Sequence, residues 1–211
     1  TIELQHDIIG MEPSWMIEEG YFSEHYFNLM STLVFGEYDI NPLTGYPRNQ
    51  EAFQLHLTKK ARDKGAKQQF NIIERANFYN ARLNFLLHLT YSDDFGNNKI
   101  KNRSSLLDED EVLRNLTDSL NNHLDFICSQ NNIAKEQTGI FVQFAFDGKN
   151  DKPYLFIPFL QNLRTQLGEE RLIYVVVPAE IKKRYGLTYD QIEQILGVAN
   201  KIVIDATNFD K

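Results

Sequence analysis

Short apolar runs without polar alternation restrict the architectures open to this chain. Leu172–Val177, for example, reads Leu-Ile-Tyr-Val-Val-Val. A strand with one face in water alternates apolar and polar residues, whereas continuous apolarity indicates burial on both faces, as in parallel sheets covered by helices. Six short apolar segments, several of them nearly continuous, predict strands at Asp7–Glu12, Leu29–Tyr38, Leu83–Tyr91, Gly139–Phe146, Arg171–Val177 and Lys201–Ala206.

Helical patterns separate these segments. Two stripes of apolar residues recur at spacings of three and four, which is typical of amphipathic helices: Leu113, Leu116, Leu120, Leu124 and Ile127, then Phe156, Phe159, Leu160, Leu163 and Leu167. Two further helical stretches are predicted over Asn49–Asp63 and Gln68–Asn80. Thr188 and Gln191 fit a capping box, in which each side chain accepts a hydrogen bond from the other residue's backbone N–H. The helix that follows should bury Ile192, Ile195 and Leu196.

The repeated strand–helix order predicts a right-handed parallel α/β fold resembling a (β/α) barrel. The chain has 211 residues and shows no linker or repeat, so we expect a single domain over residues 1–211. A complete eight-fold barrel takes about 250 residues. About six of eight units are visible, which predicts an incomplete or open barrel, or one part of a larger protein.

Composition excludes several classes of function. The formal net charge of −7 argues against a nucleic-acid partner, because phosphate binding needs a concentrated basic surface. Cys128 is the one cysteine, so neither a disulfide nor a multi-cysteine metal site can form within the chain, and we expect a buried, unreactive thiol. No apolar run approaches the roughly 20 residues of a membrane-spanning helix. No glycine-rich phosphate loop is present, and no cofactor is predicted.

Several local phrases together resemble the chitinase-like glycoside hydrolases of family 18, which are TIM barrels. Ile8–Trp15 is similar to the family's opening I-G-Y-x-P-x-W segment. Asn28–Asp39, followed by Asn41–Gly45, looks like its second strand and turn, and Leu83–Thr90 looks like its third strand. The resemblance lies in the order and spacing of these pieces, and it implies a glycan ligand and a secreted or cell-envelope location.

The fourth strand departs from the family at the catalytic residues. The family pattern is approximately D-G-x-D-x-D-x-E, in which the last Glu protonates the glycosidic oxygen and the acid before it orients the substrate's N-acetyl group. Thr138–Ala145 keeps Gly139, but the four acids become Thr138, Phe141, Gln143 and Ala145. Alanine donates no proton and glutamine does not titrate. We therefore predict a catalytically inactive module that binds a glycan or a protein or serves as a scaffold.

The residues expected to contact a ligand fall at or near the carboxyl ends of predicted strands, where barrel active sites form. They are Trp15, Glu37, Tyr38, Gln143, Asp147, Asp205 and Phe209. An alternative hypothesis keeps hydrolysis and relocates the acids to Glu12, Glu37, Asp147 or Asp205, which would need two carboxyls about 5–10 Å apart. The five histidines show no paired spacing, so no metal site is predicted, and His88 is expected to be a core residue.

Overall fold

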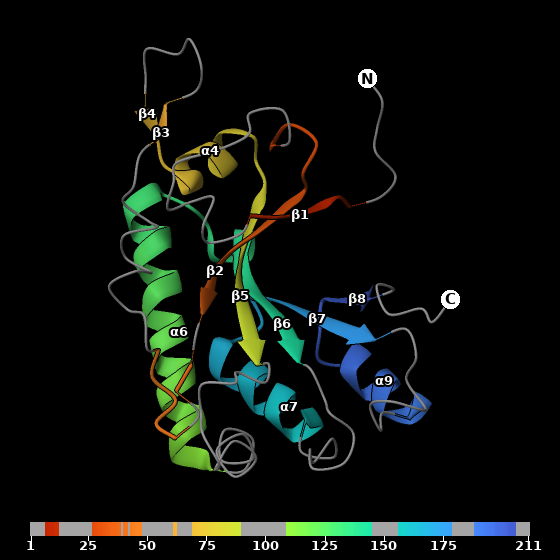
Figure 1. Ribbon diagram of the computed structural model, residues 1–211. Helices are drawn as coiled ribbons and strands as arrows, with labels where there is room; N and C mark the ends of the chain where they lie inside the picture. The colour runs from red at the N-terminus through yellow and green to blue at the C-terminus, as the bar shows by residue number, and fades with distance from the viewer. Residues whose placement is uncertain are drawn as a thin grey trace, which may run out of the picture.

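The computed structural model describes residues 7–12, 27–38, 40–41, 43–47, 61–62, 69–89, 109–144, 156–178 and 188–205 (Figure 1). Six strands form one parallel sheet in the order β1-β2-β5-β6-β7-β8. Their bounds are β1 Ile9–Met11, β2 Thr32–Tyr38, β5 Arg82–Leu89, β6 Thr138–Phe144, β7 Leu172–Pro178 and β8 Lys201–Asp205. All six predicted strands are confirmed, and the sheet curls into a half-barrel.

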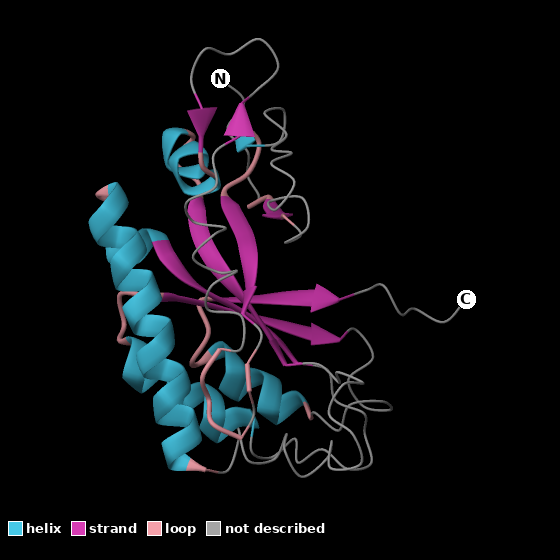
Figure 2. Ribbon diagram, turned by 60° about the vertical axis from the view of Figure 1, so that its left-hand side comes forward, coloured by secondary structure: helices cyan, strands magenta, loops and turns pink. Residues whose placement is uncertain are grey.

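Helices cover the convex side of this sheet (Figure 2). They are α4 Ile72–Phe78, α6 Asp110–Asn131, α7 Phe156–Leu167 and α9 Tyr189–Leu196, and the short 3₁₀ helix η2, Lys135–Gln137, precedes β6. Both predicted apolar stripes are buried, on α6 and α7. The Thr188–Gln191 capping box is also present at the start of α9. On that helix Ile195 is fully buried, but Leu196 is 58% exposed, so its predicted burial is wrong.

The segment between β2 and β5 differs from the prediction of two helices. β3, Ala61–Arg62, pairs antiparallel with β4, Gln69–Phe70, where the helical stretches were expected. Residues 49–60 lie outside the described part of the chain. The start of α4 is set by Asn71, whose side chain accepts from the Glu74 backbone while the Glu74 carboxylate accepts from the Asn71 backbone. Because an N-cap residue has extended backbone angles, the helix cannot include residues 69–70.

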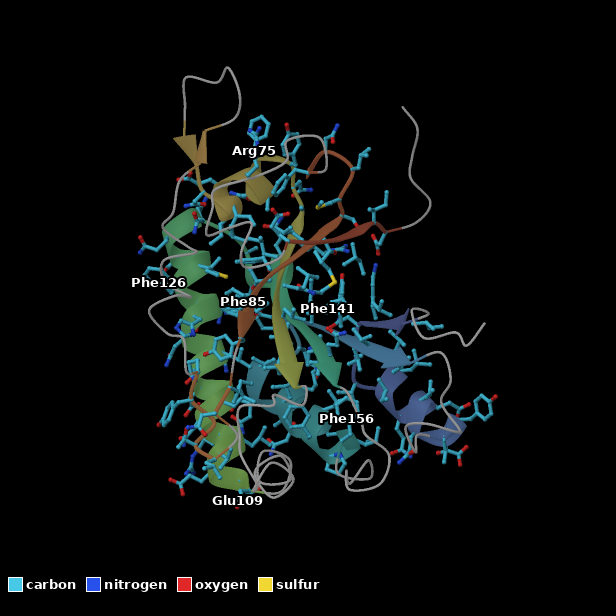
Figure 3. All side chains as sticks on the ribbon, in the orientation of Figure 1. Arg75, Phe85, Glu109, Phe126, Phe141 and Phe156 are labelled. Atoms are coloured by element: carbon cyan, nitrogen blue, oxygen red, sulfur yellow. The ribbon has the colours of Figure 1, made fainter. Side chains whose placement is uncertain are left out.

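The inner strands β2, β5, β6 and β7 bury both faces, whereas Met11 of β1 and Ile204 of β8, at the sheet edges, are 50% and 66% exposed. Leu33, Phe85 and Ile140 belong to the large cluster packed under the helices, and Phe85 is labelled in Figure 3. Their neighbours on the opposite, concave face form a second cluster, in which Val34, Phe141 and Tyr174 are the buried members. Partly buried residues complete this cluster: Ile9, Leu86, Leu172, Val176 and Val203. The inside of the half-barrel is thus packed with side chains, as in complete (β/α) barrels.

Ion pairs connect the two edge strands of the sheet at the amino ends of the strands. The carboxylate of Asp7, just before β1, forms an ion pair with Lys201 at the start of β8. It also lies 3.8 Å from the guanidinium of Arg82 at the start of β5. These side chains are about one-third to two-fifths exposed, so the pairs add little stability. Their geometry nevertheless shows how far the sheet curls, because β1 and β8 are its opposite edges.

A second arginine joins α6 to the amino ends of β6 and β7. Arg171 is 1% exposed, and its guanidinium donates hydrogen bonds to Asp125 and to the Thr138 hydroxyl. It also lies 3.3 Å from the sulfur of Cys128. Cys128 is half-buried rather than fully buried, and its thiol contacts these polar groups instead of an apolar surrounding. A buried guanidinium needs such partners, since an unpaired buried charge is strongly destabilising.

Arg164 on α7 makes hydrogen bonds to both turns that precede β7 and β8. Its guanidinium donates to the carbonyl oxygens of Gly168, Arg171 and Val198 at 2.7–3.1 Å, and to Oδ1 of Asn200 at 2.6 Å. The same Asn200 oxygen accepts from the Ile173 backbone at 2.7 Å. One side chain therefore supplies donors to three carbonyls that lie outside the strand ladders, where they would otherwise need water or another donor.

We predict that Arg164→Met lowers the free energy of unfolding by about 3 kcal/mol, because several carbonyls lose a charged donor together. Urea denaturation followed by circular dichroism measures the change. The matched control is Arg114→Met at an exposed position of α6, where a change within about 0.5 kcal/mol is expected. Equal losses in the two variants would contradict a special role for Arg164.

Candidate functional site

The carboxyl end of β6 occupies the centre of the sheet. Within the register, His88 of β5 pairs with Gln143 of β6, which pairs with Val176 of β7. Gln143 is half-buried, and its neighbour in sequence, Val142, points to the helices. Since alternate residues point to opposite faces, Gln143 lies on the concave side together with Phe141. An uncharged amide thus stands at the carboxyl end of the central strand.

The remaining described positions of β6 serve packing. Phe141 is 3% exposed and packs with Val34 and Tyr174 inside the half-barrel (Figure 3). Thr138 is fully buried and bonded to Arg171. At Gly139 an added Cβ would lie 2.0 Å from the carbonyl oxygen of Leu172, so this position admits only glycine. β6 carries no carboxylate from Thr138 to Phe144.

A β-bulge changes the direction of side chains at the carboxyl end of β2. Phe35 pairs with Phe85 and Tyr38 with Leu87, so residues 36 and 37 together oppose Leu86 alone. Gly36 has φ +61°, a conformation that glycine adopts without strain. After the bulge Tyr38 faces the helices. A glycine inside a strand pattern is the signal that could have indicated this bulge.

Tyr38 therefore lies in the core, so its predicted contact with a ligand at the strand end is wrong. Its ring is fully buried, and its hydroxyl lies 2.9 Å from Nδ1 of His123 on α6 and also bonds the Ser119 side chain. Burial raises the pKa of Tyr38 above its usual value and lowers the pKa of His123 below its usual value. Both groups are thus neutral near pH 7, and their polar contact joins β2 to α6.

Glu12 follows β1 and has the most perturbed carboxyl among the described residues. Its backbone N–H donates to the carbonyl oxygen of Val34 at 2.9 Å, which fixes it beside β2. Its Oε1 is buried and has no hydrogen-bond partner in the described part of the chain. Desolvation by burial raises the pKa of Glu12 to about 7. A carboxyl with this pKa is partly protonated at neutral pH and could donate a proton.

The other predicted contact residues are only partly placed. Trp15, Asp147 and Phe209 lie outside the described residues. Glu37 lies within β2 and Asp205 ends β8, where its backbone pairs with Pro178, but their side chains are not described; neither is that of His88. The carboxyl ends of β2, β6 and β8 belong to one parallel sheet, so these backbone positions share one end of the half-barrel.

Two further findings concern the described residues alone. No three His, Cys, Asp or Glu side chains among them converge as metal ligands would. No helix among them combines the length and the hydrophobicity that crossing a membrane requires.

Sequence reasoning missed the polar residues inside the half-barrel. Thr32, Asn84 and Tyr174 are all fully buried on the concave face. Asn84 stands inside the otherwise apolar segment Leu83–Leu87, and this interruption was the available signal. A polar residue in a doubly buried strand needs a partner within the protein or from bound water.

Comparison with solved structures identifies similar folds. The chain is similar to the spore cortex-lytic enzyme SleL of Bacillus megaterium QM B1551, with a TM-score of 0.62 and 13% identity over 94% of this chain. It is similar to a chitinase of Rhizomucor miehei, with a TM-score of 0.61 and 11% identity over 94% of this chain. A family 18 chitinase of Cycas revoluta, solved in complex with (GlcNAc)4, has a TM-score of 0.57 and 13% identity over 96%.

These likenesses confirm the predicted fold, a parallel α/β architecture similar to a TIM barrel. The chain spans 41% of the cortex-lytic enzyme and 55–56% of the two chitinases. A scan against protein-family models gives no match. A comparison with curated protein sequences gives none either.

We predict that His123 makes stability depend on pH. The unfolded chain takes up a proton at His123 near pH 6.5, whereas burial lowers the pKa in the folded state. The folded state then binds fewer protons, so the contribution of His123 is complete above pH 6.5 and is lost as the pH falls below it. Urea midpoints between pH 7.5 and 5 should fall more steeply for the unaltered chain than for His123→Gln.

The choice of variant separates titration from hydrogen bonding. His123→Gln keeps a polar partner for the Tyr38 hydroxyl, whereas His123→Phe removes it. We expect His123→Phe to lose about 1–3 kcal/mol at pH 7.5, the cost of leaving a buried hydroxyl short of a partner. Identical pH dependence in the unaltered chain and both variants would show that His123 does not titrate differently on folding.

Proposed function

We propose that this chain is a glycoside-hydrolase-like module that binds glycan at the carboxyl end of its sheet and does not hydrolyse it. The observation that carries the proposal is the composition of β6. At the positions where the family-18 pattern has acids, the inward-facing side chains include Phe141, which packs in the interior, and Gln143, a neutral amide. General acid catalysis contributes about 10²–10⁴-fold and needs a group that titrates.

The proposed ligand class rests on fold similarity together with the chemistry of Gln143. A solved neighbour, the Cycas revoluta chitinase, was determined with (GlcNAc)4. An amide can donate to and accept from sugar hydroxyls or an N-acetyl group without carrying charge. Gln143 is half-exposed, so its amide can reach a ligand above the packed interior. A protein partner at the same end, or a scaffold role, is the outcome favoured if no glycan binds.

We predict that the purified chain binds chitooligosaccharides of about four to six units and releases no shorter products. Calorimetry measures binding, and chromatography of the incubated sugar detects cleavage. Gln143→Ala should weaken binding about tenfold, which corresponds to about 1.4 kcal/mol, the scale of one or two polar contacts.

Gln161→Ala, at an exposed position of α7, is the matched control and should bind like the unaltered chain. Product release by the unaltered chain, abolished by a single carboxyl-to-amide substitution, would contradict the proposed lack of catalysis. Absence of binding across chitin and peptidoglycan fragments would contradict the glycan ligand.

One observation favours a second candidate function, a hydrolase with relocated acids. Burial raises the pKa of Glu12 to about 7, so this carboxyl has the property required of a general acid near neutral pH. Glu12 follows β1, at the carboxyl end of a strand. The second carboxyl of such a pair would have to come from Glu37, Asp147 or Asp205.

If this second function holds, Glu12→Gln should abolish hydrolysis while leaving glycan binding intact, since an amide keeps the shape but cannot donate a catalytic proton. Activity of the unaltered chain should fall as the pH rises through about 7, because Glu12 then loses its proton. Glu111→Gln, exposed on α6, is the control. Equal activity of the two variants would exclude Glu12 as the acid.

A further inference from the structure

The interior of the half-barrel contains a buried side-chain amide that has no hydrogen-bond partner among the described residues. Asn84 of β5 is 0% exposed, and neither Oδ1 nor Nδ2 has a hydrogen-bond partner in the described part of the chain. A side-chain amide can make up to four hydrogen bonds. Transferring an amide from water to an apolar interior without any hydrogen bond costs several kcal/mol. Such groups in native proteins usually bind protein atoms or ordered water.

The neighbouring positions in the sheet offer Asn84 nothing polar. Its register partners are Val34 on β2 and Gly139 on β6, one apolar and one without a side chain. Their backbone groups belong to the strand ladders. A partner for the amide therefore has to come from the space enclosed by the concave face.

An independent observation concerns two hydroxyls on the same face. Thr32 of β2 and Tyr174 of β7 are both fully buried, and their oxygens lie 3.5 Å apart. A direct O–H···O hydrogen bond is normally 2.7–2.8 Å long. Two buried hydroxyls at this longer separation are only weakly bonded to each other, so each can still bind a further polar group.

The three polar groups come from different strands and project into the same enclosed space. Thr32, Asn84 and Tyr174 lie on β2, β5 and β7, and inward-facing side chains from the strands fill the inside of a (β/α) barrel in layers. Asn84 pairs with Val34 and Gly139, whereas Tyr174 pairs with Phe141, one inward-facing position nearer the carboxyl ends. Leu86, Phe141 and Val176 are among the apolar side chains that pack on this face.

We propose that the half-barrel encloses a hydration site, in which at least one buried water molecule binds the amide of Asn84 and the hydroxyl of Tyr174, with Thr32 as a further partner. Such a water makes about three hydrogen bonds, which matches the number of groups available. This proposal does not depend on the glycan-binding function. Its role is to hold β2, β5 and β7 together through polar contacts.

The first test uses the unaltered chain. Nuclear Overhauser effects between water and the side-chain amide protons of Asn84 should report a water with a long residence time, and Asn84→Leu identifies the resonance by its loss. An Asn84 amide that is observed and protected but shows no contact with water would overturn the proposal.

The second test asks whether the groups share a partner. Asn84→Leu, Tyr174→Phe and the double variant form a cycle read by urea midpoints. We expect Tyr174→Phe to lower the midpoint clearly in the unaltered chain and hardly at all beside Asn84→Leu, because the shared water is then already lost. Tyr46→Phe, at a half-exposed tyrosine bonded to Asn115, is the control and should be additive with Asn84→Leu.

Additive effects of Asn84→Leu and Tyr174→Phe, or a higher midpoint for Asn84→Leu, would overturn the proposal. A higher midpoint is what the removal of an amide without any partner produces, since an apolar residue of similar shape avoids its desolvation. If Asn84→Leu does not fold, the water contacts of the unaltered chain still decide the question, with resonances assigned by isotope labelling of asparagine.

Discussion

The burial of both faces of one parallel sheet is the constraint from which the other features of this structure follow. On the convex face, Leu33, Phe85 and Ile140 pack under α4, α6 and α7, and on the concave face Val34, Phe141 and Tyr174 pack against one another. Neither face can then carry a ligand site of any size along the middle of the strands. Polar and charged side chains of the sheet therefore lie at the strand ends, or they are buried together with the groups that they bond. Arg164 and Arg171 illustrate the amino end, where guanidinium groups satisfy buried carbonyls and hydroxyls.

The sequence allowed the strands and the main helices to be predicted because each has a local signal. Short apolar segments, several of them nearly continuous, indicated all six strands, and the stripes at three and four residues indicated α6 and α7. The Thr188–Gln191 capping box was also identified, because both partners lie within one turn. The segment before α4 was assigned wrongly because its helical composition continues across Asn71, and only the cap geometry shows that the helix starts there. Leu196 was assigned to a buried face because it is apolar, but no described element of the chain covers it.

The candidate site was harder to predict because it depends on long-range geometry. Tyr38 lies at a strand end in the sequence, as a rim aromatic would, yet the bulge at Gly36 turns it toward His123 on α6. No local pattern reveals a partner 85 residues away. Glu12 was named as one of several strand-end acids, and only burial distinguishes it, by raising its pKa to about 7. The absence of acids from β6, in contrast, could be predicted from the sequence, because the order of the predicted strands identifies this segment as the fourth strand.

The residues of β6 also determine how stable the central strand is. Several carboxyls on one inward-facing strand repel one another and lose hydration, so a hydrolase that keeps them gives up stability at its active site. Phe141 does the opposite, since its ring is 3% exposed and packs with Val34 and Tyr174. Gln143 retains a polar group without a charge that needs a partner. An apolar ring and a neutral amide at these two positions therefore stabilise the central strand more than carboxylates would. The central strand is thus stabilised by packing along its length and keeps one uncharged polar group, the Gln143 amide, at its carboxyl end.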